Sequence, residues 1–271
     1  MHGDVAATLR AVLPQIEPKD DRSFLDRMLR EHKRKLEHAV DAYTHDIEGH
    51  LPIHPDYAAR ILDGVASEDA VFTVDTGMCN VWAARYITPN GRRRVIGSFL
   101  HGSMANALPH AIGAQLAHPG RQVISMSGDG GLGMLLGELL TVAMYELPVK
   151  IITFNNSALG MVKLEMLVEG LPNYQTDFAP VDYAAIATAA GIHSLRVEQP
   201  GDVRSALTDA LSYPGPALVD LVTDPNALSI PPHITEAQVK GFALAAGKIV
   251  LDGGVGKMLE LARANLRNIP R

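Results

Sequence analysis

Cysteine and positive charge are both scarce in this sequence. Only Cys79 of the 271 residues is a cysteine, which excludes an intrachain disulfide and a zinc site built from several cysteines. Such a composition is typical of a reducing cytoplasm. The 24 Lys and Arg are outnumbered by 30 Asp and Glu, and the net charge of -6 argues against the basic face that nucleic-acid binding requires. We therefore expect a cytoplasmic protein without a nucleic-acid partner.

Long apolar runs are also missing. The N-terminus shows neither the basic start nor the apolar stretch of a signal peptide, and no segment approaches the roughly 20 apolar residues that span a membrane. The rest of the composition, 47% hydrophobic and 20% charged, is ordinary for a globular protein. A chain of this length can bury the core of one large α/β domain and still carry extensions.

The two ends of the chain differ in pattern from its middle. Residues 1–55 are polar and helical in pattern, and residues 225–271 form a tail beyond the last predicted strand. The first end carries two apolar stripes at helical spacing among dense charges: Val5, Leu9, Val12 and Leu13, then Phe24, Leu25, Met28, Leu29, Leu36 and Val40. Helices this polar are expected on a surface or between domains.

Residues 56–224 alternate short β-rich apolar runs with helical ones. Strands are predicted at 70–75, 94–97, 122–127, 149–156, 193–198 and 217–222. Helices are predicted at 103–117, 131–147, 183–191 and 203–212. This alternation indicates an α/β fold, a doubly wound parallel sheet of about six strands with helices on both faces. Ligands of such sheets bind at the carboxyl ends of the strands.

The most informative segment, residues 124–160, joins one predicted strand to the next through a glycine-rich turn. Its glycines satisfy the GxGxxG pattern of dinucleotide sites: Gly128, Gly130 and Gly133. Such a site needs an acidic residue at the end of the second strand, but here that strand ends in Asn155 and Asn156. Asp129 would also place a carboxylate against the pyrophosphate, and two anions repel unless a cation lies between them. The dinucleotide interpretation therefore fails.

The same residues suit a divalent cation, Mg²⁺ or Ca²⁺. Asp129 offers a carboxylate oxygen, Asn156 an amide oxygen, and the backbone near Ala158 a carbonyl, while diphosphate oxygens and water complete the shell. Gly130 and Gly131 leave backbone N–H groups free to approach phosphate at the start of a helix. The alternative to a metal site is that the glycines form a tight turn and the asparagines cap a strand, with no ligand bound. Both features together, 27 positions apart, favour the metal site.

This pattern resembles the signature of thiamine-diphosphate enzymes related to pyruvate oxidase and acetolactate synthase. Longer stretches are most similar to bacterial pyruvate dehydrogenase (quinone), also called pyruvate oxidase. These stretches are DTGMCNVWAARY (75–86), GSFLHGSMANALPHAIGAQ (97–115), LPVKIITFNNSALG (147–160) and LSIPPHI (228–234). They are more specific than the metal motif, which the whole superfamily shares.

The resemblance implies a set of site residues. It assigns the metal to the Asp129 and Asn156 side chains and the Ala158 carbonyl, and the diphosphate to the turn at Gly130 and Gly131. The loop that meets the aminopyrimidine is Gly102, Ser103 and Met104, with Met104 bending the cofactor. The rest of the cofactor segment is Ser157, Leu159 and Gly160. Met161 stands where close relatives tend to carry an aromatic residue, so the substrate pocket departs from the pattern.

The family arrangement also implies what this chain lacks. Family members have a pyrimidine-binding domain, a central FAD domain and a C-terminal diphosphate domain, and the chain resembles only the third. Residues 1–55 are then a residual central-domain helix and linker, 56–224 the thiamine diphosphate and Mg²⁺ domain, and 225–271 a C-terminal tail. The activating glutamate belongs to the pyrimidine domain of a partner subunit, so we expect no catalytic residue here and no turnover by the chain alone.

The resemblance implies oxidation of pyruvate to acetate and CO₂, with electrons passing through FAD to quinone, in a homo-oligomer. An acetolactate synthase-like carboligase would share the cofactor site, and so would a non-catalytic subunit of a split enzyme. His101 and His110 flank the cofactor loop and are interpreted as structural.

The tail ends in an amphipathic helical pattern. Its apolar residues fall on one stripe: Val255, Leu259, Ala262 and Leu266. From Lys248 to Arg271 five basic residues oppose two acidic ones, a net of +3. The pattern alone favours packing on the protein's own body, whereas the family resemblance implies a lipid-responsive segment at the inner face of the cell membrane.

Overall fold

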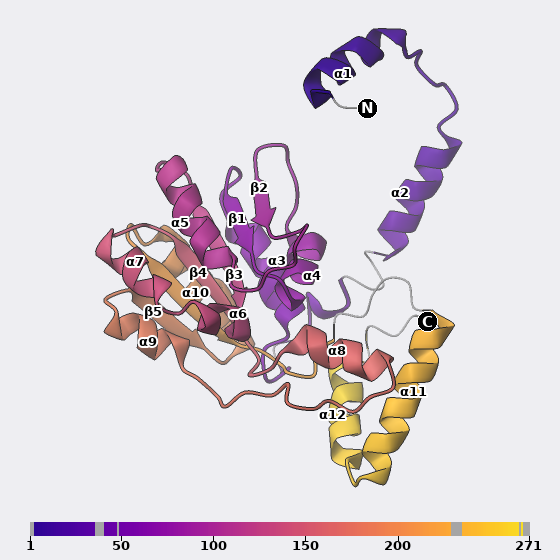
Figure 1. The fold of residues 1–271 in the computed structure, drawn as a ribbon, viewed down its shortest axis with the longest axis vertical. Helices are drawn as coiled ribbons and strands as arrows, with labels where there is room; N and C mark the ends of the chain where they lie inside the picture. The colour runs from indigo at the N-terminus through magenta and orange to yellow at the C-terminus, as the bar shows by residue number, and fades with distance from the viewer. Residues whose placement is uncertain (1–2, 36–40, 48, 229–234, 266, 268–271) are drawn as a thin grey trace.

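The computed structural model describes residues 3–35, 41–47, 49–228, 235–265 and 267. Six parallel strands form one sheet in the order β2-β1-β3-β4-β6-β5 (Figure 1). The strands are β1 (Val71–Val74), β2 (Arg94–Gly97), β3 (Val123–Gly128), β4 (Lys150–Asn155), β5 (His193–Val197) and β6 (Ala217–Val222). The predicted α/β class is confirmed, and each predicted strand lies within about a residue of its observed bounds.

Helices cover both faces of the sheet, because successive strand residues point to opposite sides. Phe72, Ile152 and Leu221 join one buried cluster, and Val71, Ile151 and Leu218 join the other. The first face is covered by α3 (Pro55–Val65), α4 (Met78–Tyr86) and α10 (Val203–Ser212). The second is covered by α5 (Ala107–Ala117), α6 (Asp129–Met134), α7 (Glu138–Met144) and α9 (Tyr183–Ala189).

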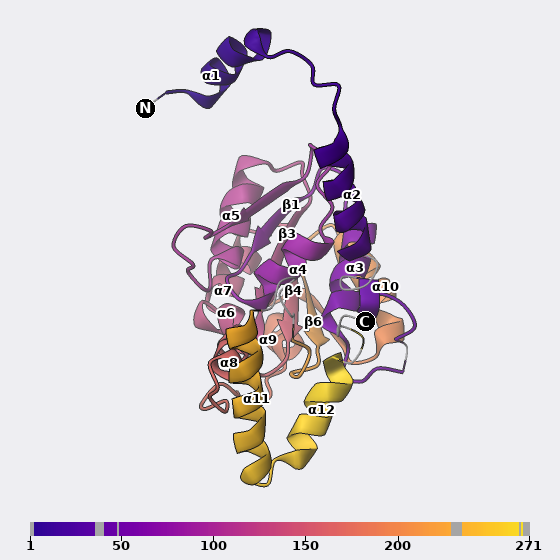
Figure 2. The same cartoon turned by 90° about the vertical axis from the view of Figure 1, so that its right-hand side faces the viewer.

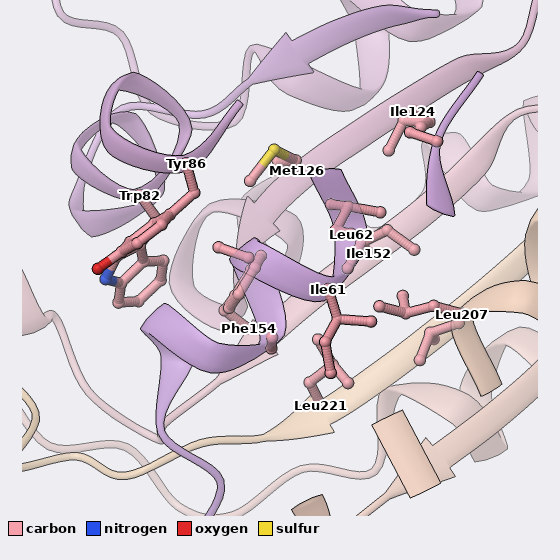
Figure 3. Packing of buried hydrophobic residues seen from close by; sticks show 14 of the residues in the cluster. Ile61, Leu62, Trp82, Tyr86, Ile124, Met126, Ile152, Phe154, Leu207 and Leu221 are labelled. Carbon is pink, nitrogen blue, oxygen red and sulfur yellow. The ribbon is translucent and has the colours of Figure 1, made fainter. Parts of the chain in front are cut away.

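The first cluster is built around aromatic side chains (Figure 3). Trp82 of α4 lies 4.8 Å from Phe154 of β4 between ring centroids, and both rings are almost fully buried. Fully burying a large apolar side chain is worth roughly 1.5–3 kcal/mol. This packing fixes α4 against the carboxyl end of the central strands.

Two predicted helices differ from the observed ones. The helix expected at 103–117 begins only at Ala107, because Gly102 (φ 66°) and Ala105 (φ 61°) are in the left-handed region. The helix expected at 131–147 is divided into α6 and α7 by a turn that includes Gly137. The loop 102–106 thereby becomes available to the site described below.

Four helices were not among those predicted: α3, α4, α8 (Gly160–Val168) and α11 (Glu236–Leu251). In α4, α8 and α11 the apolar residues do not form one clean stripe, because these helices are apolar on more than one side. A start signal for α3 was present, since His54 caps the helix and Pro55 is its first residue.

The N-terminal extension packs very little. α1 (Val5–Val12), followed by a 3₁₀ turn (Leu13–Gln15), has no buried residue. α2 (Ser23–Lys35) leaves Phe24 and Leu29 more than half exposed, and both helices extend away from the sheet (Figure 2). Leu36 and Val40 of the predicted stripe lie outside the described residues. Two further 3₁₀ turns are Asp41–Tyr43 and Pro200–Asp202.

The C-terminal extension forms a hairpin of α11 and α12 (Val255–Asn265) against α8 (Figure 2). Its small core consists of Leu167, Leu228, Ala245 and Leu261. Gly241 allows the closest approach, because a Cβ there would lie 1.8 Å from the carbonyl oxygen of Val168.

The stripe predicted for α12 faces away from this core. Val255 and Leu259 are 52% and 55% exposed, whereas Leu261 and Ala264 on the other side are buried. Leu266 and the segment 229–234 lie outside the described residues. Among the helices described, none is long and apolar enough to cross a membrane.

Candidate functional site

A pocket of about 210 Å³ opens at the carboxyl ends of the central strands. The loops that follow β1, β2, β3 and β4 all line it. β1 and β3 are neighbours, while the chain continues from β1 to one side and from β3 to the other. Such a topological switch point is where doubly wound sheets bind ligands.

Asp129 is the central charged residue of the pocket. It follows β3 directly, is 3% exposed, and accepts a hydrogen bond from the N–H of Gly130 at 2.8 Å. Burial raises the pKa of its carboxyl to about 6, and the N–H groups of Gly130, Ser157 and Ala158 partly oppose that rise. The carboxylate therefore faces the segment after β4, where the predicted partner ligands lie.

The two asparagines at the end of β4 have different roles. Asn155 points into the body, where its Nδ2 donates to Asp220 Oδ1 at 3.0 Å and to the Val181 carbonyl at 2.8 Å. Asn156 lines the pocket, and its Oδ1 accepts from the N–H of Ala158 at 3.0 Å. Only the second asparagine is available to a ligand.

Two backbone hydrogen bonds to residues 176–178 hold the segment after Asn156 in place. The N–H of Leu159 donates to the Thr176 carbonyl at 2.8 Å, and the N–H of Phe178 donates to the Ser157 carbonyl at 2.7 Å. Ser157 adopts a left-handed φ of 53°. These bonds fix the direction of the backbone at Ala158, which also lines the pocket.

The donor set fits a hard divalent cation. It combines one carboxylate, one amide oxygen and one backbone carbonyl, oxygen ligands of the kind that Mg²⁺ binds. Within the described ranges no three His, Cys, Asp or Glu side chains form a metal-binding group. A cation here would therefore depend on further oxygens from its ligand, and it would offset the cost of burying Asp129.

Hydrogen bonds from the side away from the pocket hold the turn after β3. The Tyr183 hydroxyl donates to the Asp129 carbonyl at 2.9 Å, and the N–H of Tyr183 donates to Asp220 Oδ2 at 3.1 Å. Arg196 also donates to Asp220 Oδ2, at 2.7 Å. The diphosphate turn expected at Gly130 and Gly131 therefore rests on a buried polar network.

Only some residues of the loop after β2 line the pocket. Gly102 and Met104 line the pocket, whereas Ser103 is exposed and is not part of the lining. His101 and His110 are exposed, and His110 Nδ1 lies 3.0 Å from Asn106 Oδ1. Of the remaining predicted residues, Leu159 and Gly160 line the pocket, and Ser157 approaches it through its N–H alone.

Sequence reasoning missed the residues that follow β1. Thr76, Gly77 and Met78 line the pocket with Cys79 and Trp82. Asp75, directly before them, is 1% exposed and accepts hydrogen bonds from the loop after β2. The signal was present, because the strand predicted at 70–75 ends in Asp75 and Thr-Gly follows at once.

A second missed residue is Glu165 of α8. It is exposed and lines the pocket, together with Met161 and Val162 from the first turn of the same helix. The lining of the described pocket contains two carboxylates, Glu165 and Asp129. Glu165 is the exposed one of the two, whereas Asp129 is buried.

Comparison with known proteins gives a family match over most of the sheet. The family model described as "Thiamine pyrophosphate enzyme, C-terminal TPP binding domain" matches residues 75–221. The Bacillus subtilis (strain 168) protein YdaP, described as thiamine pyrophosphate-containing, is 35% identical over 240 residues, which is 89% of this chain and 41% of that protein.

Acetolactate synthases are also similar to the chain. The large subunit of Porphyra purpurea is 35% identical over 192 residues, 65% of this chain and 31% of its own length. The probable large subunit of Methanococcus aeolicus is 35% identical over 191 residues, 67% of this chain and 32% of its own length. The chain thus spans less than half the length of the relatives it matches.

Asp129→Asn will change how stability depends on pH. Because burial raises the pKa of Asp129 to about 6, the folded chain keeps a proton that the unfolded chain releases above about pH 4. From pH 7 to pH 4 the wild type should gain about 1–3 kcal/mol of unfolding free energy relative to the variant. Urea unfolding followed by Trp82 fluorescence measures it.

Asp20→Asn, in the exposed segment between α1 and α2, is the matched control and should show no such pH-dependent difference. A constant difference between wild type and Asp129→Asn across this pH range would contradict the assigned burial penalty.

Proposed function

Because the chain belongs to the thiamine pyrophosphate enzymes and carries their C-terminal TPP binding domain, we propose that it holds the cofactor's diphosphate through a divalent cation, Mg²⁺. The proposed ligands are Asp129, Asn156 and the carbonyl of Ala158. The observation that carries this proposal is the convergence of a buried carboxylate with the segment after β4. A divalent cation between them would offset the repulsion between the diphosphate and the carboxylate in this pocket.

When bound, thiamine diphosphate would supply a carbon nucleophile for a 2-keto acid and a cationic ring that takes up the electron pair left as CO₂ departs. The residues of this chain would orient that chemistry. Met104 lies on the pocket wall and would bend the cofactor, and the buried ring of Trp82 would keep water from the apolar side. Glu165 would hold or deliver a proton at the open end of the pocket.

Other parts of the active site are proposed to come from elsewhere. Val95 and Ile96 of β2 and the following Phe99 and Leu100 are substantially exposed beside the pocket, Phe99 by 62% and Leu100 completely. An apolar surface next to a half-open site suits the pyrimidine-binding domain of a second chain in a homo-oligomer. That domain would supply the activating glutamate, so the chain alone would bind the cofactor without turnover.

Binding of thiamine diphosphate with Mg²⁺ should depend on Asp129. Asp129→Ala removes the anionic ligand and should weaken binding at least about tenfold, since one metal ligand and its charge are lost. Isothermal titration of the cofactor with Mg²⁺ into the wild-type chain and the variant measures the change.

Asp56→Asn, which alters a buried carboxylate of α3 outside the pocket lining, reports on stability alone and should alter the affinity much less. Equal heats from wild type and Asp129→Ala would sink the metal assignment.

The product formed from pyruvate distinguishes the two candidate activities, an oxidase and a carboligase. Pyruvate oxidation to acetate would require FAD and quinone, whereas a carboligase would join the decarboxylated fragment to a second keto acid. The similarity to acetolactate synthases favours the carboligase, and the stretch 97–115 together with the tail favours the oxidase. In the complete enzyme, with FAD and a quinone present, acetolactate without acetate would exclude the oxidase, and acetate alone would exclude the carboligase.

We propose that the tip of the C-terminal hairpin contacts an anionic membrane surface. Val255 is exposed there beside the 86% exposed Leu251, and Lys257 and Leu259 follow on the exposed side of α12. Val255→Asp with Leu259→Asp should reduce co-sedimentation with phosphatidylglycerol liposomes severalfold, because burial of the apolar face is lost.

The matched control carries Val5→Asp and Leu9→Asp on α1, which is also exposed, and should pellet like the wild type. Equal pelleting of the tail variant and the wild type would remove the membrane role.

A further inference from the structure

Asp75 is a buried carboxylate that the proposed metal site does not use. It follows β1 directly and is 1% exposed. Burial raises the pKa of its carboxyl to about 6, against the opposing effect of the N–H groups of Asn106, Thr76, Ala107 and Ala105. Burying a carboxylate in this place costs free energy of folding. The contacts that Asp75 makes therefore indicate which parts of the structure it stabilises.

The first contact is with the loop after β2. Asp75 Oδ1 accepts from the backbone N–H of Asn106 at 3.0 Å and from its Nδ2 at 3.1 Å. The same Nδ2 donates to the Ser103 carbonyl at 2.7 Å. One side chain thus ties Asp75 to both ends of the segment that contains Met104.

This loop needs such support. Gly102 and Ala105 are both in the left-handed region, and the conformation costs an alanine about 1–3 kcal/mol. Hydrogen bonds to a charged acceptor are among the stronger ones in proteins and can offset that cost. Asp75 is therefore placed to hold the loop in its bent form.

The second contact is with the turn after β3. A Cβ on Gly131 would lie 1.7 Å from Asp75 Oδ2, so the turn and the carboxylate fit only because residue 131 is glycine. The N–H of Asp75 also donates to the Met126 carbonyl of β3 at 2.9 Å. The same residue thus touches the loop expected at the aminopyrimidine and the turn expected at the diphosphate.

We infer that Asp75 is a positioning residue, which sets the loop containing Gly102 and Met104 at a fixed distance from the turn at Gly131. This inference rests on the proposed function, because the two segments it joins are those proposed to hold opposite ends of the cofactor. Asp75 acts through its contacts with these two segments, which include both the backbone and the side chain of Asn106. Its role depends on an acceptor oxygen at the Oδ1 position.

The test begins without any cofactor. Hydrogen–deuterium exchange of the 98–106 peptide is compared in wild type, Asp75→Ala, Asp75→Asn and Asn106→Ala. Asp75→Ala and Asn106→Ala should each speed exchange in this peptide about tenfold while β4 is unchanged, because bonds that hold the loop are lost. Asp75→Asn keeps an acceptor oxygen and should stay within about threefold of wild type.

The cofactor titration follows with the same proteins. The affinity for thiamine diphosphate with Mg²⁺ should fall about tenfold in Asp75→Ala and Asn106→Ala and much less in Asp75→Asn. Asp56→Asn is the matched control: its carboxyl is buried, burial raises its pKa to about 6, and it lies outside the pocket lining. It should change neither exchange in the loop nor affinity.

Unchanged exchange in the 98–106 peptide would overturn the inference, and so would Asp75→Asn behaving like Asp75→Ala. Faster exchange with full cofactor affinity would overturn the positioning role. If Asp75→Ala does not fold, Asn106→Ala carries the test, because Asn106 is only partly buried. A wild-type chain that gives no heat with the cofactor contradicts the proposed function, whereas the exchange experiment still decides whether Asp75 holds the loop.

Discussion

The carboxylate of Asp129, buried at the end of β3, is the constraint on which the rest of the site depends. An ionised carboxyl in this position is costly, and the pKa raised to about 6 expresses that cost. The surrounding structure reduces it only in part, with N–H groups from both neighbouring loops. This buried carboxylate, placed where four loops meet, is the basis of the proposed cation site.

The sheet explains why those loops meet. β1 and β3 lie side by side although β2 separates them along the chain, so segments 75–79 and 128–131 become neighbours at the switch point. α4 is anchored there by the ring contact between Trp82 and Phe154. Rigid packing below the loops allows them to adopt strained conformations, such as those of Ala105 and Ser157, without loss of the fold.

Much of this could be predicted from the sequence, because strand alternation and the spacing between Asp129 and Asn156 are local patterns. The six strands followed from short apolar runs alone. Helices apolar on more than one side, such as α4 and α8, were missed because periodicity needs a solvent face to be visible. The pairing of Asp75 with Asn106 could not be foreseen, since 31 positions separate them and only the fold brings them together.

The close contact of Gly241 with Val168 joins the C-terminal hairpin to α8, the helix whose Glu165 lines the pocket. α8 has nine residues and is about 13 Å long. Glu165 in its middle lines the pocket, and Val168 at its end contacts α11. A backbone-to-backbone contact leaves no side chain that could shift, so α8 and α11 can accept no larger residue than glycine at position 241. The tail and the carboxylate at the mouth of the pocket are therefore connected through a single helix, α8.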